Sequence, residues 1–276
     1  WGCWSRVLTA TEISDLVNKT DKATDVTDDL TTDKGWVSNT SDWTYNTSDY
    51  LDFATIRRST TSQEMYIDLQ DSDYLGSGNN LHASEWVVRL GKFTTGTLSS
   101  SGNVMFFIGL SNDEDADSGE SQQSIFATIN YSSSEGGIYG YCTTGNLEQG
   151  SNRVTGTVST PLAASTDYWI EISRNSNVFT VKSYSDEYIT QTGSLNLTKT
   201  GLSGLRYLKI LNDSEQNGGT ATGSKLYGDI KIWNGTTSAS TNDGALVSSL
   251  SDKSELKANY TMDSLSLGVT ELFEVT

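Results

Sequence analysis

The chain has 276 residues, of which 35 are acidic and 18 basic, and its formal net charge is −17. Such an acidic surface argues against nucleic acid and anionic membranes as partners, because their phosphates attract Lys and Arg. No apolar run approaches the length that crosses a bilayer, so we expect no membrane insertion. The length is enough to bury a full core in one large β domain or two smaller ones.

The N-terminal residues 1–20 predict a strand followed by a short helix. Thr9 is suited to the N-cap of this helix and Glu12 to its third position, which is the spacing of a capping box. The helix is expected to end at Val17. Residues 21–35 are acidic and polar, and their composition favours a linker.

Residues 36–236 contain many short stretches in which apolar and polar side chains alternate, the period of a half-buried β-strand. Turn-forming Gly, Asn, Asp and Ser residues separate these stretches, which favours an antiparallel sandwich. The strands are expected at Leu51–Arg57, Glu64–Leu69, Ser84–Phe93, Val104–Asn112, Ile125–Ile129, Gly136–Cys142, Val154–Val158, Leu205–Leu211 and Leu226–Trp233.

A β-hairpin is predicted at residues 166–186, "TDYWIEISRNSNVFTVKSYSD". Its first strand places Ile170 and Ile172 on one face, and its second strand places Phe179 and Val181 on one face. The polar residues 174–177 supply the turn. A hairpin cannot stand alone in water, so other strands must cover its apolar side.

This hairpin resembles the central hairpin of laminin-G-like domains of the concanavalin A-like lectin/glucanase superfamily. The segments "SEWVVRLGKF", "VMFFIGLSN" and "LYGDIKIWNG" resemble two early core strands and the closing strand of those domains. The resemblance implies an all-β, antiparallel jelly-roll β-sandwich over residues 36–236. It does not fix an activity, because the superfamily contains binding modules, enzymes and spacers.

The two ends of the chain resemble pieces of further laminin-G-like domains. Residues 1–20 resemble the tail of a preceding domain, and residues 255–276, which contain "SELKANYTMDSLSLG", resemble the head strand of a following domain. The Ser-, Thr- and Asp-rich residues 237–254 are expected to be a linker. This order predicts either a window from a tandem array or a circular permutation. The unpaired head of one copy could also pair with the tail of another and propagate a filament.

The sequence predicts a non-catalytic protein. Retaining glycosidases of the superfamily carry a pair of carboxylates on one strand, and no Glu-x-Asp or Glu-x-Glu occurs here. Glu171 stands alone in the central hairpin, and the one histidine, His82, lies in a polar turn. The predicted role is adhesion or assembly on an extracellular, cell or virion surface, with copies of itself or neighbouring modules as partners. The alternative is a glycan-binding module of a secreted glycoside hydrolase.

Two kinds of binding site are predicted. Asp113, Asp115 and Asp117 have the alternating spacing of oxygen ligands for Ca²⁺, although a solvated acidic loop explains them slightly better. Asp229, on the closing strand, is a second candidate ligand for Ca²⁺. Aromatic side chains that leave the apolar face of a strand can stack on sugar rings, although burial is their commoner fate. The candidates for this role are Tyr139, Tyr141, Trp169 and Trp233.

Two further features concern covalent chemistry. Cys3 and Cys142 permit one disulfide, and two separate buried thiols are the alternative. The sequons favour a glycosylated extracellular surface. They begin at Asn18, Asn39, Asn46, Asn130, Asn196, Asn212, Asn234 and Asn259.

Overall fold

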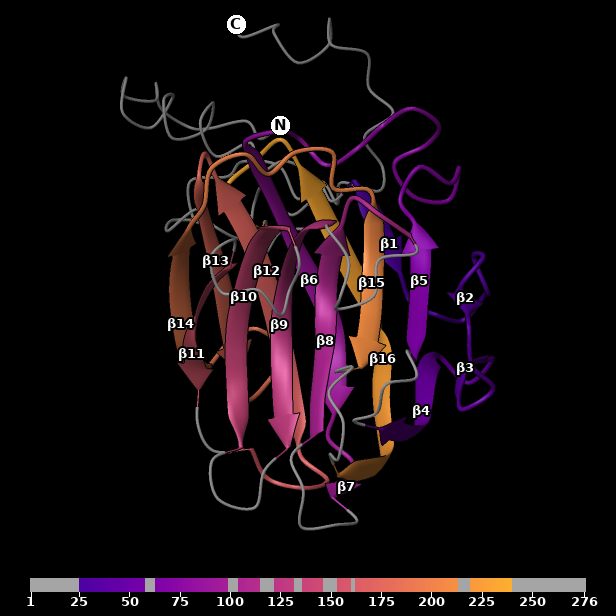
Figure 1. Cartoon of the computed structure of the whole chain (residues 1–276). Helices are drawn as coiled ribbons and strands as arrows, with labels where there is room; N and C mark the ends of the chain where they lie inside the picture. Colours follow the sequence, from indigo (N-terminus) through magenta and orange to yellow (C-terminus); the bar gives the residue numbers. More distant parts are fainter. Residues whose placement is uncertain are drawn as a thin grey trace, which may run out of the picture. The chain divides into compact units, whose positions relative to one another are not determined.

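The protein is an antiparallel β-sandwich in the part of the chain that the computed structural model describes (Figure 1). The described residues are 25–57, 63–98, 104–114, 122–131, 136–145, 153–159, 162–212 and 219–239. Their strands are β1 (Val26–Asp28), β2 (Val37–Ser38), β3 (Trp43–Asn46), β4 (Tyr50–Arg57), β5 (Glu64–Asp68), β6 (Glu85–Thr94), β7 (Thr97–Leu98), β8 (Val104–Ser111), β9 (Gln122–Tyr131), β10 (Gly137–Gly145), β11 (Arg153–Ser159), β12 (Asp167–Asn175), β13 (Val178–Tyr184), β14 (Gln191–Thr198), β15 (Tyr207–Asn212) and β16 (Thr220–Asn234).

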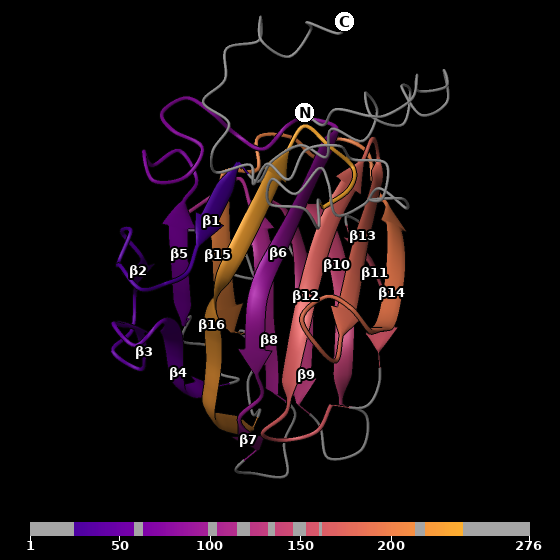
Figure 2. The same cartoon turned by 180° about the vertical axis from the view of Figure 1, so that it is seen from behind.

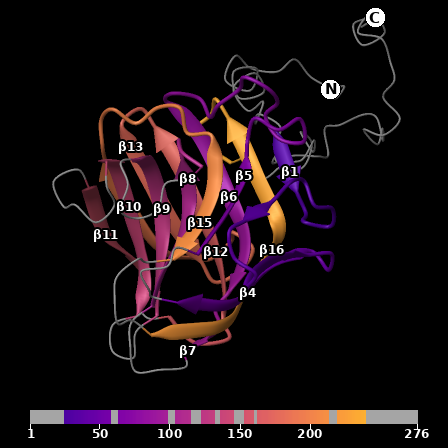
Figure 3. The same cartoon turned by 45° about the vertical axis from the view of Figure 1, so that its right-hand side comes forward.

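These strands form two sheets that pack face to face (Figure 3). The nine-stranded sheet has the order β14-β13-β12-β6-β16-β4-β3, with β1 and β7 also paired to β16. The seven-stranded sheet has the order β11-β10-β9-β8-β15-β5-β2. The predicted antiparallel sandwich is therefore confirmed. The predicted N-terminal helix lies outside the described residues, and the described part contains no helix able to span a membrane.

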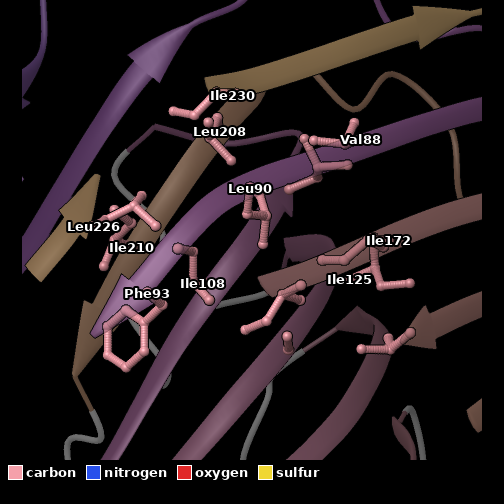
Figure 4. Close-up of a cluster of buried hydrophobic side chains, with 14 of the residues drawn as sticks. Val88, Leu90, Phe93, Ile108, Ile125, Ile172, Leu208, Ile210, Leu226 and Ile230 are labelled. Carbon is pink, nitrogen blue, oxygen red and sulfur yellow. The ribbon is translucent and has the colours of Figure 1, made fainter. Parts of the chain in front are cut away.

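The core lies between the sheets because the strands alternate as predicted. Val88 and Leu90 of β6 point inward from one sheet, and Ile108 of β8 and Ile125 of β9 point inward from the other. Figure 4 shows these side chains packed against each other between the two layers. All four are at most 1% exposed. Every second residue of these strands therefore points out of the sandwich, and those residues define its two outer faces.

One open side of the sandwich is closed by a leucine of β14. Gly140 of β10 and Gly156 of β11 are paired in register, and both face inward. A Cβ at Gly140 would lie 2.9 Å from Leu195 Cδ2, and a Cβ at Gly156 would lie 2.8 Å from Leu195 Cδ1. The two glycines therefore leave the space that the leucine of the facing sheet fills.

The structure corrects the predicted linker at residues 21–35. Val26 to Asp28 form β1, which pairs with β16 in the register Val26↔Ile232, and Asp28 and Leu30 are fully buried. The high content of acidic residues hid this strand, because the Asp28 carboxylate is satisfied inside the domain. It accepts hydrogen bonds from the Tyr74 hydroxyl and from the backbone N–H of Leu30.

The predicted hairpin is confirmed as β12 and β13. Ile172 pairs with Val181, and both side chains lie in the core. The turn is shorter than predicted, because pairing continues to Asn175 and Val178. Ser176 takes the left-handed conformation, with φ 57°, that closes this tight turn.

Candidate functional site

The outer face of the seven-stranded sheet is unusually rich in large apolar side chains. We call the outward side chains of β8, β9 and β10 the β8–β10 face; this sheet faces the viewer in Figure 1. Phe107 lies at its centre, with its ring centroid 5.9 Å from that of Phe126 and 5.6 Å from that of Tyr141. Phe126 is fully buried, Phe107 and Tyr141 are nearly so, and Tyr139 is half-buried. The sandwich core does not need these residues, because the inward side chains of the same strands already form it.

Three polar side chains of β9 lie on the same face. Ser124 and Thr128 are fully buried, and Asn130 is half-buried. Within the described part of the chain, Ser124 Oγ, Thr128 Oγ1 and Asn130 Oδ1 have no hydrogen-bond partner. A buried polar atom without a partner costs about 1–3 kcal/mol, so a ligand hydroxyl that reached one of these atoms would be favourable. Asn130 is partly open, whereas neighbouring side chains must move aside before a ligand reaches Ser124 or Thr128. Thr128 is paired with Tyr139 on β10, which puts a hydroxyl and an aromatic ring side by side.

Four charged side chains at β5 and β15 are already paired with each other. Lys209 of β15 is fully buried, and its Nζ lies 2.6 Å from Glu64 Oε1 and donates to the carbonyl oxygen of Glu114 at 2.7 Å. Arg206 Nε donates to Asp68 Oδ1 at 2.8 Å. The hydrogen bond from Arg206 lowers the pKa of the Asp68 carboxyl. The sheet therefore presents aromatic rings and neutral oxygens, together with ion pairs that are mutually neutralised.

The candidate calcium loop is described only in part. Asp113 lies after β8, and Asp115 and Asp117 lie outside the described residues. The Lys209 ammonium lies 3.4 Å from the carbonyl oxygen of Asp113, so a positive charge is already present where the loop begins. Asp229, with φ 78°, lies 3.9 Å from Lys231 Nζ. Within the described ranges, His, Cys, Asp and Glu side chains do not gather in groups of three that could hold a metal. Calcium binding stays a prediction.

The four predicted sugar-binding aromatics fall on opposite sides of the sandwich. Tyr139 and Tyr141 lie on the β8–β10 face. Trp169 and Trp233 lie on the outer face of the nine-stranded sheet, since their strand neighbours Ile170 and Ile232 point into the core. Trp169 is half-buried, whereas Trp233 is 1% exposed and lies 5.4 Å from the Arg89 guanidinium. The structure therefore offers two separate surfaces, and no single site contains all four residues.

Glu171, the isolated carboxylate of the hairpin, is part of an ion network on the outer face of the nine-stranded sheet. Arg89 Nε donates to Glu171 Oε2 at 2.9 Å, and Lys182 Nζ donates to Oε1 at 2.8 Å. Tyr188, from the β13–β14 loop, lies over Arg89 with its ring centroid 4.2 Å from the guanidinium carbon. Burial lowers the pKa of Lys182, but the hydrogen bond that it donates to Glu171 and the charge of that carboxylate raise it, and the net shift is upward. Both oxygens of Glu171 are engaged, so it is poorly suited to act as a nucleophile.

Of the two cysteines, Cys142 is a free thiol buried in the core. Burial raises the pKa of this thiol to about 12, which makes it unreactive. Cys3 lies outside the described residues.

The predicted sequons differ in access to their side chains. Asn39 and Asn196 are exposed, whereas Asn212 is 2% exposed and its Nδ2 donates to the carbonyl oxygen of Arg57. Asn46, Asn130 and Asn234 are intermediate, and Asn18 and Asn259 lie outside the described residues. In the folded domain, Asn39 and Asn196 are therefore the sequons best placed to carry a glycan.

Comparison with known proteins gives matches to solved structures alone. No protein-family model matches the chain, and no curated protein matches it. One similar structure is the VIP36 exoplasmic/lumenal domain in its Ca²⁺/Man2-bound form, with a TM-score of 0.48, 10% identity, and coverage of 88% of this chain and 91% of that one. Another is the legume lectin-like domain from Entamoeba histolytica, with a TM-score of 0.46, 10% identity, and coverage of 72% and 89%.

A third similar structure is the CBM2 module of the evolved Dit of Lactobacillus casei BL23 phage J-1, with a TM-score of 0.47, 12% identity, and coverage of 78% and 99%. The matched structures include a legume lectin-like domain, and the laminin-G-like assignment of this chain stays a prediction. With TM-scores below 0.5, these matches carry no argument about a ligand, which must come from the residues of this chain.

Proposed function

We propose that the sandwich is a non-catalytic carbohydrate-binding module whose β8–β10 face holds the sugar. One observation carries the proposal. Ser124, Thr128 and Asn130 place neutral oxygens on β9 without partners in the described part of the chain, and β9 pairs with the strand that carries Tyr139 and Tyr141, with Thr128 opposite Tyr139. Binding sites for small polar ligands combine apolar walls with a few well-placed polar groups in this way.

The chemistry of a pyranose fits this arrangement. The C–H face of the sugar ring is apolar and packs on an aromatic ring, while its hydroxyl groups need acceptors at the edge. Tyr139, half-buried, supplies the ring, and the neighbouring Thr128 supplies an acceptor. Lys209 and Arg206 are already paired with Glu64 and Asp68, so these two cations are not available to an acidic sugar. We infer that a neutral sugar is bound.

The ion pairs also support a binding role over hydrolysis. Glu171, Glu64 and Asp68 are each bound by a Lys or Arg side chain. A retaining glycosidase needs two carboxylates that face one substrate, one of which must be free to take and give a proton. These three carboxylates are held as ion-pair partners instead.

The setting that we propose is an extracellular, cell or virion surface, where the module serves adhesion or assembly. Copies of itself or neighbouring modules would be its protein partners. The exposed sequons at Asn39 and Asn196 support such a location. The alternative is a module that directs a secreted glycoside hydrolase to its polysaccharide. Ca²⁺ held by Asp113, Asp115 and Asp117 would order the loop after β8 and belongs to the same proposal.

A glycan array tests the proposal with the wild-type chain and two matched variants. Tyr139→Ala removes the half-buried ring of the proposed site and is expected to lose the binding of sugars that this site holds. Tyr66→Ala removes a half-buried tyrosine of the same sheet that lies four strands, or about 19 Å, from Tyr139. This control variant is expected to bind sugar like the wild type. Equal loss in both variants would reject this site. A wild-type chain that binds no glycan but self-associates in sedimentation would favour assembly over carbohydrate binding.

A further inference from the structure

A row of aromatic side chains crosses the outer face of the nine-stranded sheet, opposite to the proposed sugar site. Tyr50 of β4 is paired with Tyr227 of β16, Tyr227 with Lys92 of β6, Lys92 with Trp169 of β12, and Trp169 with Tyr184 of β13. We call these five residues the aromatic row. They lie at one level on five adjacent strands, so the row runs across the strands. Figure 2 shows this sheet from its outer side.

The rings of the row contact each other and two lysines, one of which lies outside the row. The Tyr50 and Tyr227 ring centroids are 5.4 Å apart. Lys92 Nζ lies 4.2 Å from the Tyr227 ring centroid, and Lys225 Nζ lies 4.2 Å from that of Tyr50. Tyr50, Tyr227 and Trp169 are partly exposed, and Tyr184 is 7% exposed. The row is thus a preformed surface that is open along most of its length.

Polar side chains flank the row on one side. Asp52, Lys225, Thr94 and Asp167 form the next level on the same face, in consecutive register across β4, β16, β6 and β12. Thr94 Oγ1 donates to Asp167 Oδ1 at 2.6 Å, and Lys92 Nζ lies 3.5 Å from Asp167 Oδ2. With Lys92 of the row counted, the two aspartates are matched by two lysines, which suits a neutral ligand rich in hydroxyl groups.

Backbone irregularities mark the other side of the row. The register shifts between Tyr227 and Ile230, between Trp169 and Glu171, and between Ser183 and Tyr184. The pairs β16–β6, β6–β12 and β13–β14 are therefore irregular on this side of the row. Bulges of this kind re-aim side chains and are frequent next to functional sites. The β13–β14 loop then folds onto the sheet beside the row, where the Tyr188 hydroxyl accepts from the N–H of Gly91 at 3.0 Å. Tyr188 contacts Tyr184 edge-on at 5.4 Å.

We propose that the aromatic row is a second carbohydrate-binding surface, which takes an extended neutral polysaccharide lying across the strands. Adjacent strands are about 4.8 Å apart, which is comparable with the length of one sugar unit in an extended chain. Four strand steps separate Tyr50 from Tyr184, or about 19 Å, so the row accommodates about four units. The β8–β10 face is compact by comparison and lies on the other sheet. The module is therefore bivalent, with one surface for a chain interior and one for a smaller sugar.

The test is calorimetric titration of the whole chain with linear neutral oligosaccharides of one to six units, such as gluco-, manno- and xylo-oligosaccharides. Affinity is expected to rise with length and to level off near four units. Tyr227→Ala and Trp169→Ala are expected to weaken binding of the tetrasaccharide by about tenfold each, because each removes one stacking ring. Tyr139→Ala, on the other sheet, is expected to leave tetrasaccharide binding at the row unchanged.

The failures of the two proposals are distinguishable. Loss of binding in Tyr139→Ala alone, with wild-type behaviour in Tyr227→Ala and Trp169→Ala, would overturn the row and keep the first site. Affinity that does not depend on length would also overturn the row. If Trp169→Ala abolished concentration-dependent dimerisation and no oligosaccharide bound, the row would be an interface between copies. Should Trp169→Ala not fold by circular dichroism, Tyr50→Ala at the other end of the row gives the same test.

Discussion

Replacing Thr128 by valine is expected to stabilise the protein and weaken sugar binding at the same time. The side chain is fully buried on the β8–β10 face, between Phe107 of β8 and Tyr139 of β10, and its hydroxyl has no partner among the described residues. Valine keeps the shape and removes the unpaired group, which costs about 1–3 kcal/mol where it stays unsatisfied. We expect a gain of about 1 kcal/mol in the free energy of unfolding.

The affinity should change in the opposite direction. If a sugar hydroxyl donates to Thr128 Oγ1, valine removes one neutral hydrogen bond, worth about 0.5–1.5 kcal/mol. The dissociation constant should rise roughly 2- to 10-fold. In a domain of this size, the gain in stability corresponds to a rise of about 2–4 °C in Tm.

Differential scanning calorimetry and titration with the best ligand from the array measure both effects. Thr157→Val is the matched control, because Thr157 is paired with Tyr139 from the other side but is exposed to solvent. It should change neither quantity measurably. A loss of stability above 1 kcal/mol in Thr128→Val would show that the hydroxyl has a partner inside the protein, and the argument for this site would fail.

Two further predictions concern the ion pairs of the same sheet. Lys209→Met should lower the free energy of unfolding, measured in urea at neutral pH, by about 3–5 kcal/mol, because it leaves the Glu64 carboxylate buried without its cation. Adding Glu64→Gln should recover much of this loss. A Lys209→Met variant with the wild-type urea midpoint would refute a buried pair. The Asp68 pKa is lowered by Arg206 from its ordinary value of 3.8, so the ion pair stabilises the fold above that pH and its contribution is lost as pH falls through the lowered pKa. Thermal melts of Asp68→Asn should therefore depend less on pH below 3.8 than those of the wild type, and parallel curves would contradict the pairing.

The inner faces of the strands could be predicted from the sequence because their signal is local. Val88 and Leu90, or Ile170 and Ile172, are two positions apart, and a period of two assigns them to one face regardless of what the rest of the chain does. The sequence also contains a signal for the apolar outer face of β8–β10. Phe106 and Phe107 are consecutive, and a strand that is apolar on both faces is expected to be covered on both.

The arrangement of the candidate sites could not be predicted in the same way. Tyr50, Lys92, Trp169 and Tyr227 come from four separate stretches of the chain, and only the strand order and the bulges bring them to one level. Register depends on long-range pairing, which no local pattern encodes. For the same reason, the sequence grouped Tyr139 with Trp169 as sugar candidates although the fold puts them on opposite faces. β1 was missed because three residues with a buried aspartate resemble an acidic linker.

The pairing of β1 with β16 has a mechanical consequence for a module that is anchored through both of its ends. The two strands are antiparallel, and the first described residue, Asp25, lies beside Asn234 at the end of β16: the N–H of Asp25 donates to Ile232 O, and the N–H of Asn234 donates to the Asp25 carboxylate. A force that pulls these two residues apart loads the terminal bond first and opens the pair one bond at a time, as a zip opens.

The strand that yields is short. β1 contains three residues, or about 10 Å of extended chain, whereas β16 is held on its other contacts by β6 and β4. Under tension, β1 should detach at low force and lengthen the tether, while β6, β12 and β16 keep the aromatic row in register. A module that holds a surface-bound glycan would then respond to a sudden load by releasing a short stretch of chain before the glycan dissociates.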